Sequence, residues 1–113
     1  MKTASLTQEL TFDDKRPAIQ ILLETETSKE IRIIFKKGQV MKKHHTPFPI
    51  VVEVFKGKID FGLETETKHL EAGNLIALAG SVPHDLTAIE DSIVRLSLSK
   101  QDKLERVKNI ETA

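Results

Sequence analysis

Apolar and polar residues alternate over short stretches along most of the chain, and small turn-forming residues separate these stretches. Period-two alternation is typical of β-strands, because successive side chains of a strand point to opposite faces of its sheet. In the last stretch, for example, Val94, Leu96 and Leu98 share one face. The strands that we expect are 18–23, 31–35, 39–45, 49–55, 58–63, 68–70, 75–79, 86–89 and 92–99. Short strands separated by turns about every 8–12 residues predict a β-sandwich or barrel.

Both ends of the chain depart from this pattern. Residues 1–16 are mostly polar, and we expect an arm that adds a strand to a neighbouring sheet or stays disordered. Residues 101–113 place Leu104, Val107 and Ile110 at helical spacing, which predicts a short helix. We therefore expect one domain, with an arm at 1–16, a barrel at 17–100 and a helical tail at 101–113.

Composition excludes several classes of function. The 113 residues include 17 Lys and Arg and 17 Asp and Glu, so no basic surface for nucleic acid or acidic membranes is implied. There is no Cys, which excludes disulfides, thiolate catalysis and a Cys-type zinc site. No apolar run reaches the roughly 20 residues that cross a bilayer, and residues 1–12 lack the apolar core of a signal peptide. A soluble cytoplasmic protein is the expectation.

The histidines that the chain offers for chemistry lie in two stretches that begin with glycine. His44 and His45 adjoin a Thr-Pro-Phe-Pro corner between Gly38 and Gly57, and His84 follows a second strand that begins after Gly73. If His44 points into a barrel, strand alternation also turns Lys42 and Thr46 inward and His45 outward. The same rule puts Ile50 on an inner face of the following strand.

The first of these stretches resembles the first motif of the cupin superfamily of small β-barrels. That motif has the pattern Gly, five residues, His, one residue, His, three or four residues, Glu, six residues, Gly. Gly38, His44 and Gly57 match it in type and spacing. Thr46 stands where the motif has its second His, and Ile50 stands where it has Glu.

The second stretch resembles the second cupin motif, which has the pattern Gly, five residues, Pro, one residue, Gly, two residues, His, three residues, Asn. Gly73 and His84 match in type and spacing. Ala79, Ser81 and Ala88 replace the other three motif residues. Together the two motifs place the resemblance between about residues 30 and 99.

The resemblance implies an all-β fold, a cupin jelly-roll barrel or double-stranded β-helix of about six to ten strands. It also implies metal ligands at His44 and His84, with His45 as a weaker candidate. Two of the four ligand positions carry Thr46 and Ile50, so we expect at most a weakly bound divalent ion such as Zn, Mn, Fe or Ni. The alternative is that His44 and His84 bind water or each other in a wet barrel mouth.

Three functions fit these residues. The first is binding of a small organic ligand by His44, Thr46, Ile50, His84 and Lys42, and we favour it. The second is a metal-dependent oxygenase or isomerase that uses His44 and His84. The third is a structural protein whose barrel is filled by its own side chains.

Apolar residues on the outer face predict self-association. Val51 and Phe55 lie on the face opposite Ile50. Apolar residues exposed on an outer face are typical of a protein–protein interface. The arm adds further apolar residues, which are Leu6, Leu10 and Phe12. Proteins similar to this one commonly pair through such a face, so we expect a homodimer.

Overall fold

The computed structural model describes residues 1–100, and all of its regular structure in this part of the chain is β-strand. The nine strands are β1 (Ala18–Glu24), β2 (Ser28–Phe35), β3 (Val40–His44), β4 (Ile50–Lys56), β5 (Lys58–Gly62), β6 (Thr67–Glu71), β7 (Leu75–Leu78), β8 (His84–Ala88) and β9 (Ser92–Ser99). The helix expected at 101–113 lies outside the described residues. Across residues 1–100 we find no helix with the length and hydropathy of a membrane span.

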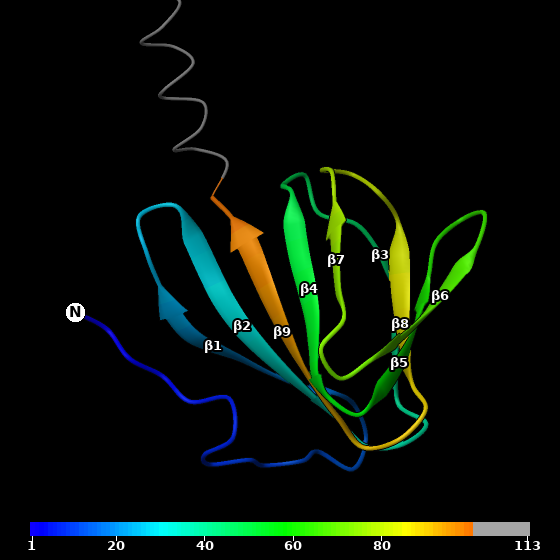
Figure 1. The fold of residues 1–113 in the computed structure, drawn as a ribbon, viewed down its shortest axis with the longest axis horizontal. Helices are drawn as coiled ribbons and strands as arrows, with labels where there is room; N and C mark the ends of the chain where they lie inside the picture. Colours follow the sequence, from blue (N-terminus) through cyan, green and yellow to red (C-terminus); the bar gives the residue numbers. More distant parts are fainter. Residues whose placement is uncertain (101–113) are drawn as a thin grey trace, which may run out of the picture.

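The strands form two antiparallel sheets that face each other. One sheet has the order β1-β2-β9-β4-β7, and the other has the order β3-β8-β5-β6. The sheets come together where β4 leads into β5 and diverge toward the opposite end (Figure 1). This arrangement confirms the expected all-β jelly-roll barrel.

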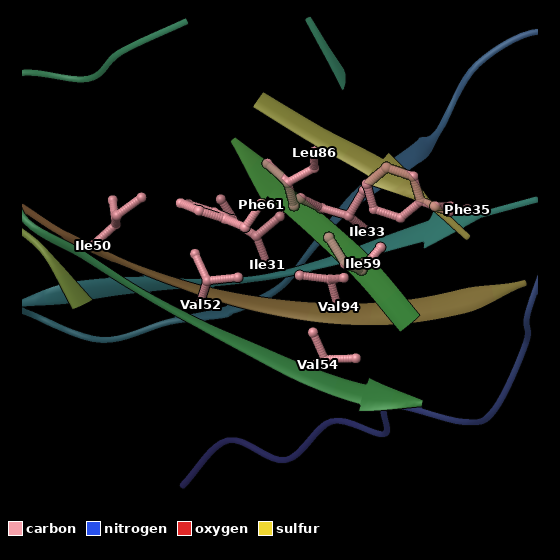
Figure 2. Packing of buried hydrophobic residues seen from close by; sticks show 11 residues of the cluster. Ile31, Ile33, Phe35, Ile50, Val52, Val54, Ile59, Phe61, Leu86 and Val94 are labelled. Atoms are coloured by element: carbon pink, nitrogen blue, oxygen red, sulfur yellow. The ribbon is translucent and has the colours of Figure 1, made fainter. Parts of the chain in front are cut away.

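Alternating residues of both sheets fill the space between them (Figure 2). The buried core consists of Ile31, Ile33, Phe35, Ile50, Val52, Val54, Ile59, Phe61, Leu86, Ala88 and Val94. Phe35, Val54 and Val94 are fully buried, whereas Leu78 and Leu98 pack against the core and stay partly exposed. Leu78 and Leu98 lie at the strand ends where the two sheets diverge.

The N-terminal arm forms no strand, so the prediction that it extends a sheet is wrong. Instead the guanidinium of Arg32, whose residue is 1% exposed, donates hydrogen bonds to main-chain carbonyls of Ser5, Gln8 and Glu9. It also donates to the side-chain oxygen of Gln20 on the adjacent strand β1. A buried side chain thus satisfies backbone groups of the arm that a sheet ladder would otherwise pair.

The outer face of the larger sheet keeps exposed apolar residues. Val51 and Phe55 of β4 and Leu75 of β7 are all exposed. They include the two residues from which we expected self-association, and the homodimer stays a prediction.

Candidate functional site

His44 and His84, forty residues apart in the sequence, are neighbours in the structure. β3 ends at His44 and β8 begins at His84, and the two residues are paired across the antiparallel ladder. Their ring centroids lie 4.4 Å apart, with an angle of 60° between the ring planes. The structure therefore brings together the two histidines of the predicted site. Their role in binding stays a prediction.

The histidine pair lies at the end of the barrel where the two sheets diverge (Figure 1). β4 begins at this end, and β7 and β9 finish there, so the apolar residues Ile50, Leu78 and Leu98 lie at the same end. Ile50 is paired with both leucines across its sheet. We call His44, His84, Ile50, Leu78 and Leu98 the mouth of the barrel.

Each imidazole of the mouth is oriented by a main-chain carbonyl. Nδ1 of His44 is 2.7 Å from the carbonyl oxygen of Lys42, and Nδ1 of His84 is 2.9 Å from that of Val82. A carbonyl oxygen only accepts hydrogen bonds, so Nδ1 carries the proton in both rings. In a neutral ring this leaves the lone pair of Nε2 free for another partner.

His84 is held in apolar surroundings. Its residue is 3% exposed, and its ring stacks on that of Phe61 with centroids 5.4 Å apart and an angle of 7° between the planes. Burial lowers the pKa of His84 below its ordinary value, and nearby His44 lowers it further. The hydrogen bond to the Val82 carbonyl opposes this shift without reversing it.

The lowered pKa of His84 predicts that acid destabilises the protein. Below the ordinary histidine pKa of 6.5, the unfolded chain binds a proton at His84 more readily than the folded chain does. The free energy of unfolding should therefore fall from pH 6.5 down to the lower folded-state pKa, and His84 should add no further pH dependence below it. Urea unfolding between pH 8 and 5 measures this change. His84→Gln should reduce the fall and the exposed control His45→Gln should keep it, whereas an unchanged profile in His84→Gln would contradict the assignment.

Lys42 does not share the inner face of β3 with His44, so that prediction is wrong. Met41 is paired with Leu86 and His44 with His84, which puts one more residue between the pairs on β3 than on β8. The extra residue forms a β-bulge, and strict alternation does not hold through a bulge. Met41 consequently packs against the core while Lys42 is exposed.

The other predicted contacts have different surroundings. Thr46 is half-buried, and its hydroxyl donates a 2.8 Å hydrogen bond to the carbonyl of Phe48, which fixes the proline-rich corner. Ile50 is 4% exposed and belongs to the core, whereas His45 is exposed. The corner also contacts the loop before β8, because Ser81 donates its N–H to the Thr46 carbonyl at 2.6 Å.

The residues of the mouth do not fit a resident metal ion. Two imidazoles are present, the position of a carboxylate is taken by Ile50, and the Thr46 hydroxyl is engaged within its own corner. Within residues 1–100, no three His, Cys, Asp or Glu side chains are grouped so that they could hold an ion. Since metal sites in enzymes normally use three protein ligands, we derive no reaction step through a metal.

Clefts elsewhere on the molecule are lined by other residues. One of about 460 Å³ lies beside Phe12, Ala18 and Arg32, where the arm meets the larger sheet. Another of about 590 Å³ lies beside Glu24 and Lys100. Neither has His44 or His84 in its wall.

Solved structures provide the comparison with known proteins. No family model and no curated protein matches the chain. An RmlC-like cupin protein from Desulfovibrio desulfuricans superposes with a TM-score of 0.81 at 24% identity, over 88% of this chain and 96% of that chain. The chain has the cupin fold.

Two further cupin-like structures illustrate the range of similarity. An uncharacterised protein with a double-stranded β-helix domain from Klebsiella pneumoniae has a TM-score of 0.77 at 19% identity, over 84% of this chain and 81% of that chain. KdgF from a Halomonas species has a TM-score of 0.74 at 18% identity, over 92% and 99% of the two chains. At such identities the cupin fold is shared, while the activity of each protein is its own.

Proposed function

We propose that this cupin-fold protein binds a small organic molecule at the mouth of its barrel. The observation that carries the proposal is the meeting of His44 and His84, with ring centroids 4.4 Å apart, at the end of an apolar core where the two sheets diverge. Small-molecule sites are typically concave and mostly apolar, with a few convergent polar groups that fix the ligand's orientation.

The walls of the mouth support the same function. Leu78 and Leu98 pack against the core but keep part of their surface exposed, unlike the fully buried residues at the closed end. A ligand that covers such surface gains roughly 25 cal/mol for each Å² of apolar area removed from water. The two imidazoles, each held at Nδ1 by a carbonyl, supply fixed polar contacts beside this apolar wall.

A fragment screen observed by methyl NMR tests the proposal. Protein labelled at Ile and Leu methyl groups should show shifts at Ile50, Leu78 and Leu98 with molecules that bind the mouth. The exposed residues Ile19 and Leu75 lie away from the mouth and serve as internal controls. Removal of a hydrogen-bonding ring in His84→Phe should weaken binding by up to about tenfold.

The contrary outcome is equally clear. If a library of several hundred fragments moves only Ile19, Leu75 or other outer residues, the mouth is not a binding site. The barrel would then be a structural unit filled by its own side chains.

A further inference from the structure

The polar groups of the mouth are hydrogen-bond acceptors. Both Nδ1 atoms already donate, at 2.7 Å to the Lys42 carbonyl and at 2.9 Å to the Val82 carbonyl. The Nε2 atom of each neutral ring is therefore an acceptor. A ligand that contacts these rings must supply the hydrogen.

The two side-chain donors predicted for the mouth, Lys42 and Thr46, have other surroundings in the structure. The bulge in β3 leaves Lys42 exposed and puts Met41 on the inner face in its place. The Thr46 hydroxyl donates its only hydrogen to the Phe48 carbonyl at 2.8 Å. The hydroxyl is thus engaged within its own corner, and the inner-face position predicted for the ammonium is occupied by Met41 instead.

Prolines and internal hydrogen bonds remove several main-chain donors from the two loops next to the mouth. Pro47, Pro49 and Pro83 have no N–H group. The N–H of Phe48 is directed to the Thr46 hydroxyl oxygen at 3.3 Å, and the N–H of Ser81 is directed to the Thr46 carbonyl at 2.6 Å. The N–H groups of Phe48 and Ser81 are thus engaged within the loops themselves.

Burial disfavours the charged form of the His84 ring. His84 is 3% exposed and stacks on Phe61, and its pKa lies below the ordinary value because burial disfavours the charged imidazolium. An anionic group next to this ring would meet a neutral acceptor in apolar surroundings. Such contact leaves a buried charge without a partner, which is strongly unfavourable.

We propose that the mouth selects an uncharged organic molecule that presents a hydroxyl or N–H donor from an apolar body, such as an alcohol, a phenol or an amide. The donor group binds Nε2 of His44 or His84, and the apolar body covers Leu78 and Leu98. This inference rests on the proposed function, since it names the ligand class of the same site.

Three probes that share one aromatic ring test the selection at pH 8, above the ordinary histidine range. Phenol offers a donor, anisole replaces its hydrogen by a methyl group, and benzoate carries a charge. We expect phenol to bind the mouth about five- to tenfold more tightly than anisole, and benzoate to bind most weakly. Dissociation constants come from the methyl shifts of Ile50, Leu78 and Leu98. In His84→Phe the preference for phenol over anisole should fall to twofold or less.

The ring nitrogens give a second readout that requires no variant. Long-range ¹H–¹⁵N spectra of the free protein should show Nδ1 protonated and Nε2 unprotonated in His44 and His84, and phenol should shift Nε2. A protonated Nε2 in both free rings would overturn the inference whatever binds.

The two proposals fail in different ways. If anisole or benzoate binds the mouth more tightly than phenol, the ligand class is wrong while the binding function stands. If neither the probes nor a wider library shift the mouth methyl groups, both proposals are wrong.

Discussion

Replacing Phe61 by alanine should lower the free energy of unfolding by about 3–5 kcal/mol, as is usual for a large aromatic residue in a close-packed core. Phe61 is fully buried in β5, where it is paired with Leu86 of β8. Its ring also stacks on His84. Truncation therefore leaves a cavity between the core and the mouth, and the surrounding strands can close it only in part.

Phe55→Ala is the matched control for this prediction. The substitution is chemically the same, but Phe55 lies on the outer face of β4 and is 39% exposed. We expect a loss below about 1 kcal/mol, which is typical of surface positions. Urea unfolding of both variants gives the two free energies. Equal losses would show that Phe61 is not the core residue described here.

Phe61→Ala also tests the environment of His84. Once the ring of Phe61 is removed, water can approach the His84 imidazole, and its lowered pKa should return toward the ordinary value of 6.5. An NMR titration of the His84 ring detects this change even where the protein is only partly destabilised. A pKa that stays where it was would mean that other neighbours exclude water from the ring.

The strands could be predicted because the alternation of apolar and polar residues indicates which side chains face the core. Apolar and polar residues alternate from Val94 to Ser99, and β9 has the predicted bounds 92–99 in the structure. The meeting of His44 and His84 followed from glycine spacings that match the cupin motifs. In the structure His84, Leu86 and Ala88 form one buried row of β8. Local periodicity and motif spacing were therefore sufficient for the fold and for the position of the histidine pair.

Features that depend on partners distant in the sequence could not be predicted in this way. The bulge in β3 appears only when its register against β8 is known, so alternation put Lys42 on the wrong face. Arg32 lies between apolar residues of β2, a pattern that predicts an exposed side chain, yet the residue is 1% exposed. Its guanidinium binds the main-chain carbonyls of Gln8 and Glu9 in the arm. Every residue has a carbonyl, so the sequence does not indicate which ones will bind Arg32.

Both departures depend on segments that are distant in the sequence. The register of β3 against β8 turns Lys42 outward, and Arg32 donates hydrogen bonds to carbonyls of the arm and to the Gln20 side chain. The Lys42 carbonyl orients His44, and the carbonyls of the arm surround Arg32. Any sequence-based prediction of the site therefore identifies the histidines more readily than the groups that orient them.

Replacing Gly57 by alanine should cost about 2–6 kcal/mol, which is the largest effect that we expect from a single methyl group in this chain. Gly57 is the residue that joins β4 to β5, and its φ of +93° is one that side-chain-bearing residues rarely adopt. Such strain costs about 1–3 kcal/mol. A Cβ would also lie 2.5 Å from the Asp91 carbonyl oxygen and would overlap the Ser92 hydroxyl, and overpacking costs a further 1–3 kcal/mol or so.

Ser92 cannot easily move aside to relieve that overlap. It is 1% exposed, and its hydroxyl accepts a hydrogen bond from the Lys58 N–H at 3.1 Å and donates one to the Glu90 carbonyl at 2.7 Å. Displacement would leave the Lys58 N–H without this partner in the turn that carries the chain from one sheet to the other. The strain and the lost hydrogen bond therefore act on the same connection.

Gly73→Ala separates the two contributions to this effect. Gly73 has a nearly identical φ of +96°, but a Cβ there would meet nothing within 4 Å, so only the backbone strain of about 1–3 kcal/mol should appear. Urea or thermal unfolding of the two variants measures the difference, which we expect to be about 1–3 kcal/mol in the direction of a less stable Gly57→Ala. Equal destabilisation would mean that the turn at Gly57 opens without loss and that close packing against Ser92 does not hold the two sheets together at this end.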